Sequence, residues 1–190
     1  MRLILASASP RRAELLAAAG FEFDVIPADI DETPRPGESA VDYTQRVARD
    51  KSRSVATVQR DSTAVVLAAD TEVVVDDAIL GKPSSTEDAS RMLRLLSGRT
   101  HDVLTAVVVW AHGRELSEVV STRVEFTRMS DREIADYVRS GEPMGKAGGY
   151  GIQGYASRFI PRIEGSWSNV VGLPIHAVHR LLAKVESIGP

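Results

Sequence analysis

The pattern of apolar and polar positions at the start of the chain predicts a strand, a turn and a helix. Residues 2–6 form a short apolar run, and alanine and leucine then recur at helical spacing over residues 10–19 until Gly20 interrupts them. Pro10 suits the first helical position, because its missing N–H is not needed there. Ser9, directly before it, can cap the free N–H groups of the first turn.

The next segments predict a strand, a loop, an exposed helix and a buried strand. Residues 21–27 alternate apolar with polar, and residues 29–37 form a polar, proline-rich loop. Residues 39–59 have the alanine-rich texture of an exposed helix whose outer face carries arginine and lysine. Residues 64–75 are almost continuously apolar, which is typical of a central strand buried on both faces. The expected inner face of the helix consists of Val41, Val47, Ala48 and Val55.

The second half of the chain carries the same kinds of signal in a different order. Helical and strand spacings of apolar residues follow one another, separated by turn residues. A capping box from Ser130 to Glu133 marks the start of one helix, and Pro174 marks the start of the last. The expected elements are a helix over 85–97, strands over 101–110 and 119–129 with a turn near 112–113, a helix from 131 to 141, an irregular glycine-rich segment over 145–154, and a helix over 174–185.

This order of elements predicts an α/β fold with a mixed central β-sheet flanked by helices. Strands and helices alternate early, which favours parallel pairing, whereas the two adjacent later strands favour antiparallel pairing. A chain of 190 residues fits one domain over residues 1–190, or one domain with two lobes around a cleft. The sequence shows no internal repeat and no interdomain linker.

Composition and charge exclude several classes of protein. Hydrophobic residues make up 43% and charged residues 26% of the chain, which is ordinary for a globular protein. The formal net charge of −3 leaves no overall basic field, so we expect no stable nucleic-acid partner, and any anion site must be local. The absence of cysteine excludes disulfides, thiolate zinc sites and a cysteine nucleophile. No stretch reaches the roughly 18–20 apolar residues of a membrane span, so we expect a cytoplasmic protein with no membrane partner.

The first candidate for chemistry is the segment from Ser7 to Arg12, at the junction of the first strand and helix. A helix N-terminus presents unpaired N–H groups and a partial positive charge, so this turn can hold a phosphate. Arg11 and Arg12 add positive charge where the helix dipole alone disfavours it, and therefore indicate a bound anion. The alternative is a capped surface helix whose arginines are solvated.

The second candidate is Asp70, which interrupts the apolar strand together with Thr71 and Glu72. A carboxylate in an apolar strand needs a partner, a metal or a reacting water, because burial of an unpaired charge costs several kcal/mol. Glu72 lies on the same side of the strand as Asp70, since side chains alternate with a period of two. The alternative is a structural carboxylate in an ion pair.

The third candidate is the acidic loop that contains Asp29, Asp31 and Glu32. Together with Asp70 it could hold Mg²⁺, which proteins bind through one or two carboxylates and substrate phosphate oxygens. The alternative is an ordinary solvated loop.

Lysines and histidines add weaker signals. Among Lys51, Lys82 and Lys146, Lys82 is favoured for a functional role because Gly81 and Pro83 fix the backbone around it. The one pair of histidines at a plausible metal spacing, His176 and His179, is interpreted as surface or packing residues.

Taken together and in order along nearly the whole chain, these motifs resemble the Maf family of nucleoside triphosphate pyrophosphatases. The resemblance implies a deep cleft in a mixed α/β fold, a divalent cation (Mg²⁺, Mn²⁺ or Co²⁺) and hydrolysis between the α- and β-phosphates of the substrate. The residues that carry it are Ser7, Ser9, Pro10, Arg11, Arg12, Asp31, Glu32, Arg46, Lys51, Ala69-Asp70-Thr71, Gly81-Lys82-Pro83, Gly98-Arg99-Thr100-His101, Gly151-Ile152-Gln153-Gly154 and Asn169-Val170-Val171-Gly172-Leu173-Pro174.

The resemblance also implies a role for each matching residue. Asp70 accepts the proton of the attacking water, and Asp70 and Glu32 are the metal-binding carboxylates. The implied catalytic set is Asp70, Glu32 and Lys82, and the implied substrate-binding set is Ser7, Ser9, Arg11, Arg12, Lys51, Thr71 and Gln153.

Three of these positions divide the family by substrate. Arg11, Thr71 and Gln153 match the branch that prefers dTTP and UTP rather than the branch that prefers 7-methyl-GTP. A glutamine amide carries both a donor and an acceptor, so it can read the O4 and N3–H edge of uracil or thymine. One position departs from that branch: Gly145 stands where an aspartate usually precedes Lys-Ala-Gly.

A second class of function stays open beside the enzyme. The family's association with cell division also allows a non-catalytic regulator of septum formation that binds nucleotides or nucleic acid. Carboxylates beside phosphate disfavour it, because a pure binder of polyanions gains nothing from Asp70 and Glu32. The sequence leaves open a homodimer, the physiological substrate and any preference for modified pyrimidine nucleotides.

Overall fold

The computed structural model describes residues 2–59 and 63–188. The chain forms two compact units, and each unit is built from several separate segments of the chain. Unit 1 contains the residues up to 70, residues 105–120 and the residues from 172 onward, and unit 2 contains residues 71–104 and 121–171. No helix of the described ranges is long and apolar enough to cross a membrane.

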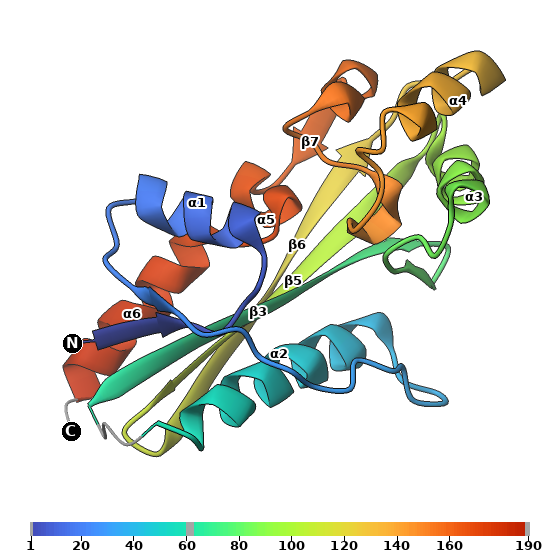
Figure 1. The fold of residues 1–190 in the computed structure, drawn as a ribbon. Helices are drawn as coiled ribbons and strands as arrows, with labels where there is room; N and C mark the ends of the chain where they lie inside the picture. The colour runs from blue at the N-terminus through green and yellow to red at the C-terminus, as the bar shows by residue number, and fades with distance from the viewer. Residues whose placement is uncertain (1, 60–62, 189–190) are drawn as a thin grey trace. The chain divides into compact units, whose positions relative to one another are not determined.

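The described strands form one mixed seven-stranded sheet, as the sequence predicts (Figure 1). Their order is β2-β1-β3-β5-β6-β7, and β4 pairs separately with β3. Strand β1 runs parallel to β2 and β3, whereas β4 is antiparallel to β3 and β7 is antiparallel to β6. The bounds are β1 Arg2–Leu5, β2 Asp24–Val25, β3 Ala64–Val75, β4 Ala78–Leu80, β5 Thr100–Ala111, β6 Arg114–Glu125 and β7 Arg162–Glu164.

The five predicted helices are present in the predicted order, and the described residues form a further short helix over Trp167–Val171 that the sequence pattern did not indicate. Within the described residues the α-helices are α1 Pro10–Ala18, α2 Ala40–Ala56, α3 Thr86–Leu96, α4 Asp131–Arg139, α5 Trp167–Val171 and α6 Ile175–Ile188, with short 3₁₀ helices η1 Ala147–Gly149 and η2 Tyr155–Phe159. The predicted capping box is present, because the Ser130 side chain accepts from the Glu133 N–H while the Glu133 side chain accepts from the Ser130 N–H.

Unit 1 is a three-layer structure in which α1 and α6 cover one face of its strands and α2 covers the other (Figure 1). Side chains alternate along a strand, so Val65, Leu67 and Ala69 of β3 join the core on the α1 and α6 side. Val66 and Ala68 join the opposite core, which includes Val55 of α2. Both faces of β3 are therefore buried, which explains its unbroken apolar run. By the same alternation Asp70 belongs to the α2 face.

Unit 2 packs α3 and α4 around an aromatic core. Phe126, Tyr137 and Tyr150 are almost fully buried there, together with Leu93 and Leu96 of α3. Gly148 of η1 lies against β3 in the left-handed region, with φ of 67°. A Cβ atom at Gly148 would come within 2.8 Å of the Val73 side chain, so this close approach requires glycine.

Several local expectations prove wrong. The strand expected over residues 119–129 spans Arg114–Glu125. The second strand is limited to Asp24–Val25, because only these residues pair with β1. The Ser9 side chain makes no capping hydrogen bond; instead the Ser9 N–H donates to Ser7 Oγ at 3.2 Å. On α2, Val41 is 44% exposed rather than part of the inner face.

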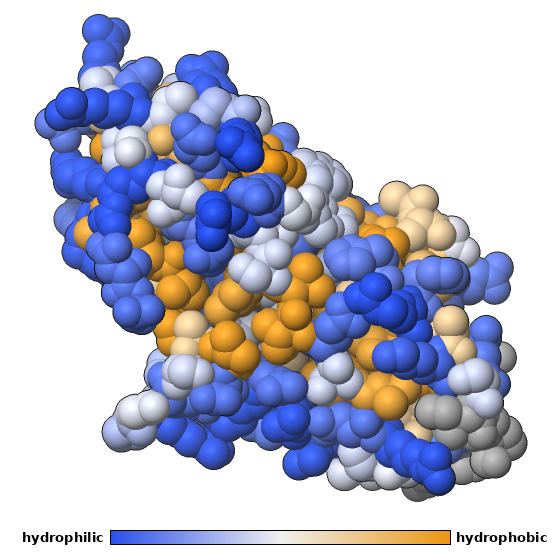
Figure 2. Space-filling model, turned by 180° about the vertical axis from the view of Figure 1, so that it is seen from behind, coloured by the Kyte–Doolittle hydropathy of each residue, from blue (hydrophilic) through white to orange (hydrophobic). Residues whose placement is uncertain are grey.

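The surface is mainly polar. In the view of Figure 2 hydrophilic residues cover most of the surface, and hydrophobic residues show in smaller areas. The exposed large hydrophobic residues of the described chain are Val25, Val41, Val58, Met144 and Trp167.

Candidate active site

The most unusual feature of unit 1 is a lysine that bridges two carboxylates. The Lys51 ammonium donates to Asp70 Oδ1 at 2.8 Å and lies 2.8 Å from Glu32 Oε1. Asp70 and Lys51 are only 5% and 8% exposed, so this ion pair is shielded from solvent. The structure thus brings together three residues that the sequence assigns to the site.

The helical period explains why Lys51 points inward. Val47, Lys51 and Val55 follow one another at a spacing of four residues, so they share one face of α2. All three are buried, which places the lysine inside the apolar stripe of the helix. The expected solvated outer face therefore does not include Lys51, and its charge is balanced by Asp70 and Glu32.

The two oxygens of Asp70 have different surroundings. Oδ1 accepts from Lys51, whereas Oδ2 is buried and has no hydrogen-bond partner among the described residues. A buried carboxylate oxygen without a partner is costly and indicates that another group completes the site. A divalent cation or a water molecule fits this oxygen, since hard cations prefer oxygen ligands and Glu32 supplies a second carboxylate nearby. The described residues contain no group of three or more histidine, aspartate or glutamate side chains placed to hold a metal ion, so a cation here would need substrate or water oxygens as well.

Helix α2 also holds the acidic loop that carries Glu32. The Tyr43 hydroxyl donates to the Glu32 backbone carbonyl at 2.9 Å. Arg46 donates to both carboxylate oxygens of Glu38 at 2.6 and 2.9 Å and to the Thr33 carbonyl at 3.1 Å. The hydrogen bonds from Arg46 lower the pKa of Glu38 to about 2, so the pair stays charged at neutral pH.

The other acidic residue of the family motif serves the turn. Asp31 Oδ1 accepts from the Thr33 N–H at 2.9 Å, and the hydrogen bonds from Thr33 lower the pKa of Asp31. Asp31 is exposed and Glu32 is half-buried. Of these two neighbours, Glu32 is therefore the carboxylate that joins Asp70.

The first helix presents a second group of site residues in unit 1. Arg12 is 9% exposed; its Nε donates to the Gly172 carbonyl at 2.8 Å and its Nη1 to Ser7 Oγ at 3.2 Å. Ser7 Oγ also accepts from the Ser9 N–H, so the hydroxyl links the turn to the guanidinium. A buried guanidinium held at the start of a helix is suited to bind an anion. Arg11 is half-buried.

Three predicted residues belong to unit 2. Thr71 follows Asp70 on β3 and is half-buried, Lys82 is exposed between β4 and α3, and Gln153 is exposed on the segment before η2. Their membership of the site stays a prediction.

Sequence reasoning missed the residues that support this site. Tyr43, Glu38 and Gly172 contact site residues through a hydroxyl, a carboxylate and a carbonyl. The spacing of Tyr43, Val47 and Lys51 by four residues was the available signal for Tyr43. Gly172 stands in the Asn169-to-Pro174 motif of the resemblance, but that motif does not indicate its contact with Arg12, which joins residues 160 positions apart.

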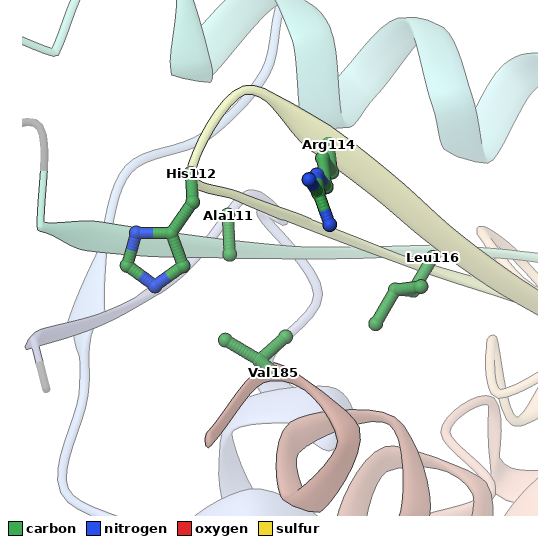
Figure 3. A pocket seen from close by; sticks show the side chains of 5 residues that line it. All are labelled: Ala111, His112, Arg114, Leu116 and Val185. Carbon is green, nitrogen blue, oxygen red and sulfur yellow. The ribbon is translucent and has the colours of Figure 1, made fainter. Parts of the chain in front are cut away.

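A small pocket of unit 1 lies elsewhere. Figure 3 shows His112 at the turn of the β5–β6 hairpin, near Val185 of α6. The pocket encloses about 230 Å³, including open solvent, and none of the predicted site residues lines it. The lining residues are Ala111, His112, Arg114, Leu116 and Val185.

Known proteins resemble this chain over most of its length. A family model described as Maf-like protein matches residues 2–185. The dTTP/UTP pyrophosphatase of Koribacter versatilis (strain Ellin345) is 50% identical over 184 residues, which cover 97% of this chain and 94% of that protein. The protein of the same name from Anaeromyxobacter dehalogenans (strain 2CP-C) is 52% identical over 96% of this chain and 93% of that protein. Among solved structures, the Staphylococcus aureus Ham1 protein matches 69% of this chain and 73% of its own with 16% identity and a TM-score of 0.44.

Proposed function

The chain belongs to the Maf-like protein family, whose model spans residues 2–185, and from this premise we propose that it is a dTTP/UTP pyrophosphatase. It hydrolyses the bond between the α- and β-phosphates and releases the nucleoside monophosphate and pyrophosphate. Relatives named for this activity are about half identical to the chain over nearly its full length. The single structural observation that supports the chemistry is the buried Asp70 with one oxygen on Lys51 and the other without a partner.

Asp70 is the proton acceptor in this proposal. The Asp70 carboxylate takes a proton from the attacking water, the water oxygen bonds to the α-phosphorus, and the bond from the α-phosphorus to the oxygen that bridges it to the β-phosphorus breaks. Lys51 orients Asp70, since the ammonium donates to Oδ1 at 2.8 Å. The electron pair of the broken bond leaves with pyrophosphate.

Asp70 and Glu32 would also hold the divalent cation (Mg²⁺, Mn²⁺ or Co²⁺). The cation would neutralise phosphate charge, which is the main requirement of phosphoryl transfer. The residues fit this role, because the unpaired Asp70 oxygen and the half-buried Glu32 carboxylate are hard oxygen ligands.

The remaining assignments follow the family pattern. We assign phosphate binding to Ser7, Ser9, Arg12, Lys51 and Lys82, with Lys82 completing the catalytic set. We assign recognition of the pyrimidine base to Arg11, Thr71 and Gln153. The cytoplasmic location and the absence of a nucleic-acid partner stay predictions.

A panel of triphosphates tests the function. Pyrophosphate release from dTTP, UTP, CTP and 7-methyl-GTP is measured with Mg²⁺, Mn²⁺ and Co²⁺ in turn. We expect turnover of dTTP and UTP well above that of the other two. Nucleotide binding without pyrophosphate release in any metal would favour the non-catalytic regulator of septum formation, and a preference for 7-methyl-GTP would remove the pyrimidine assignment.

A further inference from the structure

The segment that carries Gln153 is held at one end by the carboxylate of Glu142 and at the other by the hydroxyl of Tyr137, which is bonded to that carboxylate. Glu142 Oε2 accepts from the Tyr155 N–H at 2.8 Å, and Glu142 Oε1 accepts from the Tyr137 hydroxyl at 2.9 Å. The same hydroxyl accepts from the Gly151 N–H at 3.2 Å. Gly151 and Tyr155 each stand two residues from Gln153, so Glu142 and Tyr137 bracket it through its neighbours' backbone.

We call Glu142 and Tyr137, with their hydrogen bonds to Tyr155 and Gly151, the clamp. The Tyr137 side of the clamp is closely packed. Tyr137 is fully buried on α4, and its ring stacks on Tyr155 with centroids 5.3 Å apart and an interplanar angle of 14°. The guanidinium of Arg158 lies over the Tyr155 ring, 4.1 Å from its centroid. Burial raises the pKa of Tyr137 above its usual range, so the group keeps its hydroxyl proton and can donate to Glu142 while it accepts from Gly151.

The Glu142 side is fixed by its own backbone. Its N–H donates to Ser140 Oγ at 3.2 Å, and its carbonyl accepts from the Lys146 ammonium. These contacts fix the Glu142 backbone, so binding of the carboxylate to its two donors costs side-chain rotamer freedom only.

Both glycines beside Gln153 lie directly against the clamp. A Cβ at Gly154 would lie 2.4 Å from Glu142 Oε2, and a Cβ at Gly151 would lie 3.0 Å from Lys146 Cε. Real Cβ atoms do not approach other atoms to 2.4 Å, so an alanine at residue 154 must push the carboxylate away. Glycine at this position thus allows the Glu142 contact to form.

We propose that Glu142 is a positioning residue that fixes the 150–154 segment and thereby sets the selectivity of the enzyme for its base. A short segment without regular hydrogen bonding can present an amide in several directions, and a selective site needs one of them. The inference deepens the proposed function and rests on it, because it takes Gln153 as the residue that reads the pyrimidine.

Two substitutions at Glu142 separate the contact from the charge. Glu142→Gln keeps an oxygen for the Tyr155 N–H, whereas its N–H₂ group replaces the oxygen that accepts from the Tyr137 hydroxyl. Glu142→Ala removes both contacts. Glu125→Ala, at an exposed glutamate of β6 in the same unit, is the matched control.

The readout is the ratio of kcat/KM for UTP to that for CTP, together with the inhibition constant of inorganic tripolyphosphate, which has no base. We expect Glu142→Ala to lower the ratio about tenfold or more, mainly through KM, because small misplacements of a binding group have large kinetic effects. The tripolyphosphate constant should change less than twofold, and Glu142→Gln, which keeps the contact with Tyr155, should recover part of the ratio. An equal loss for both nucleotides, or no recovery by glutamine, overturns the proposal.

Gly154→Ala gives an independent route to the same effect. The methyl group displaces the Glu142 carboxylate from outside, so this variant should lower the UTP to CTP ratio as Glu142→Ala does. Added to Glu142→Ala it should lower the ratio no further, since the carboxylate is already absent. Additive losses would mean that Gly154 acts on its own and would overturn this part of the argument.

Hydrogen exchange keeps the clamp testable if the enzyme assignment fails. Glu142→Ala should speed amide exchange in peptides that cover residues 149–156, whereas Glu142→Gln and Glu125→Ala should leave it near the wild-type rate. Unchanged exchange in the alanine variant overturns the positioning role. If Glu142→Ala shows faster exchange but the wild-type protein turns over neither dTTP nor UTP, the proposed function is refuted while the structural role of Glu142 stands.

Discussion

At the scale of single residues the decisive group is Asp70. Asp70→Asn should abolish pyrophosphate release while it keeps much of the nucleotide binding, because the amide preserves the shape but can neither accept the proton nor hold a cation strongly. Steady-state turnover of dTTP and nucleotide binding by calorimetry are the two measurements. A folded Asp70→Asn protein with near wild-type turnover would remove Asp70 from the mechanism.

Lys51 should matter for stability as well as for activity. Lys51→Met removes the cation from the buried Asp70 and costs about 3 kcal/mol of unfolding free energy, since breaking a buried pair strands its partner. The contact between Lys51 and Glu32 should contribute little to this loss of stability, because the Glu32 side chain is 38% exposed.

The double variant Lys51→Met/Asp70→Asn isolates this pair. It should lose less stability in urea unfolding than the sum of the two single variants, since the neutral amide no longer needs a cation. Strict additivity would show that the 2.8 Å contact contributes nothing to stability.

Gln153 carries the prediction about the base. Gln153→Glu should lower kcat/KM for dTTP and UTP more than for CTP, because the carboxylate keeps an acceptor but loses the N–H that meets O4. The comparison uses both proteins at one metal concentration. If all substrates fall equally, Gln153 supports its segment rather than selecting the base.

At the scale of elements the glycine-rich segment offers a matched pair. Gly145 and Gly148 both have positive φ, of 71° and 67°. A Cβ at Gly145 meets nothing within 4 Å, whereas one at Gly148 would clash with Val73. Gly145→Ala should therefore cost about 1 kcal/mol for the left-handed backbone alone, and Gly148→Ala should cost clearly more. Equal melting temperatures of the two variants would contradict this distinction.

The open space around Gly145 also matters because the branch of the family that prefers dTTP and UTP usually has an aspartate at this position. Aspartate tolerates the left-handed region better than most residues. No atom lies within 4 Å of the position a Cβ would occupy, so an aspartate there needs no repacking. The effect of the missing carboxylate on rate or metal preference stays a prediction.

The elements that the sequence predicts best are those with a strong local pattern. The expected bounds of β3 match Ala64–Val75, because a strand buried on both faces is apolar throughout. The capping box of α4 is equally local. The spacing of Lys51 by four residues from Val47 and Val55 indicates its inward direction, but its partners Asp70 and Glu32 could not be predicted, since both lie far from it in sequence.

Site residues were recognisable by type but not by their arrangement. Asp70 stood out because a carboxylate interrupts an apolar strand. The sequence does not show whether Asp31 or Glu32 joins Asp70, because both are acidic residues of one polar loop. In the structure Asp31 accepts from the Thr33 N–H, whereas Glu32 contacts Lys51. The clamp on Gln153 depends on Tyr137, whose hydroxyl contact crosses from α4 to an irregular segment.

At the scale of the whole molecule the free energy of unfolding should depend on pH through His101. His101 is 2% exposed and its Nε2 pairs with the Tyr150 hydroxyl at 2.8 Å. Burial lowers its pKa from 6.5 to about 4. Between these values the unfolded chain binds a proton that the folded chain does not, so stability falls with falling pH, by about 3 kcal/mol at pH 4.

Urea unfolding at steps between pH 7.5 and 4 checks this dependence. The contribution should become flat above about pH 7.5, where the imidazole is almost entirely neutral in both states. His101→Gln keeps a donor for Tyr150 and carries no titrating group, so its stability should fall about 3 kcal/mol less over the same range. Parallel curves for the two proteins would contradict the role of His101.

The contact between Arg12 and the Gly172 carbonyl has a consequence for how the protein is made. Synthesis begins at the N-terminus, so a growing chain carries Ser7, Arg12 and Asp70 long before residue 172 exists to hold the guanidinium. The hydrophobic core that contains Leu3 and Leu5 of β1 cannot form completely before that point either, because it includes Leu181 and Val185 of α6. A polypeptide released early by a premature stop codon would contain most of the recognisable signature and yet lack the phosphate-binding arrangement. Within a cell, only finished chains would consume nucleotide.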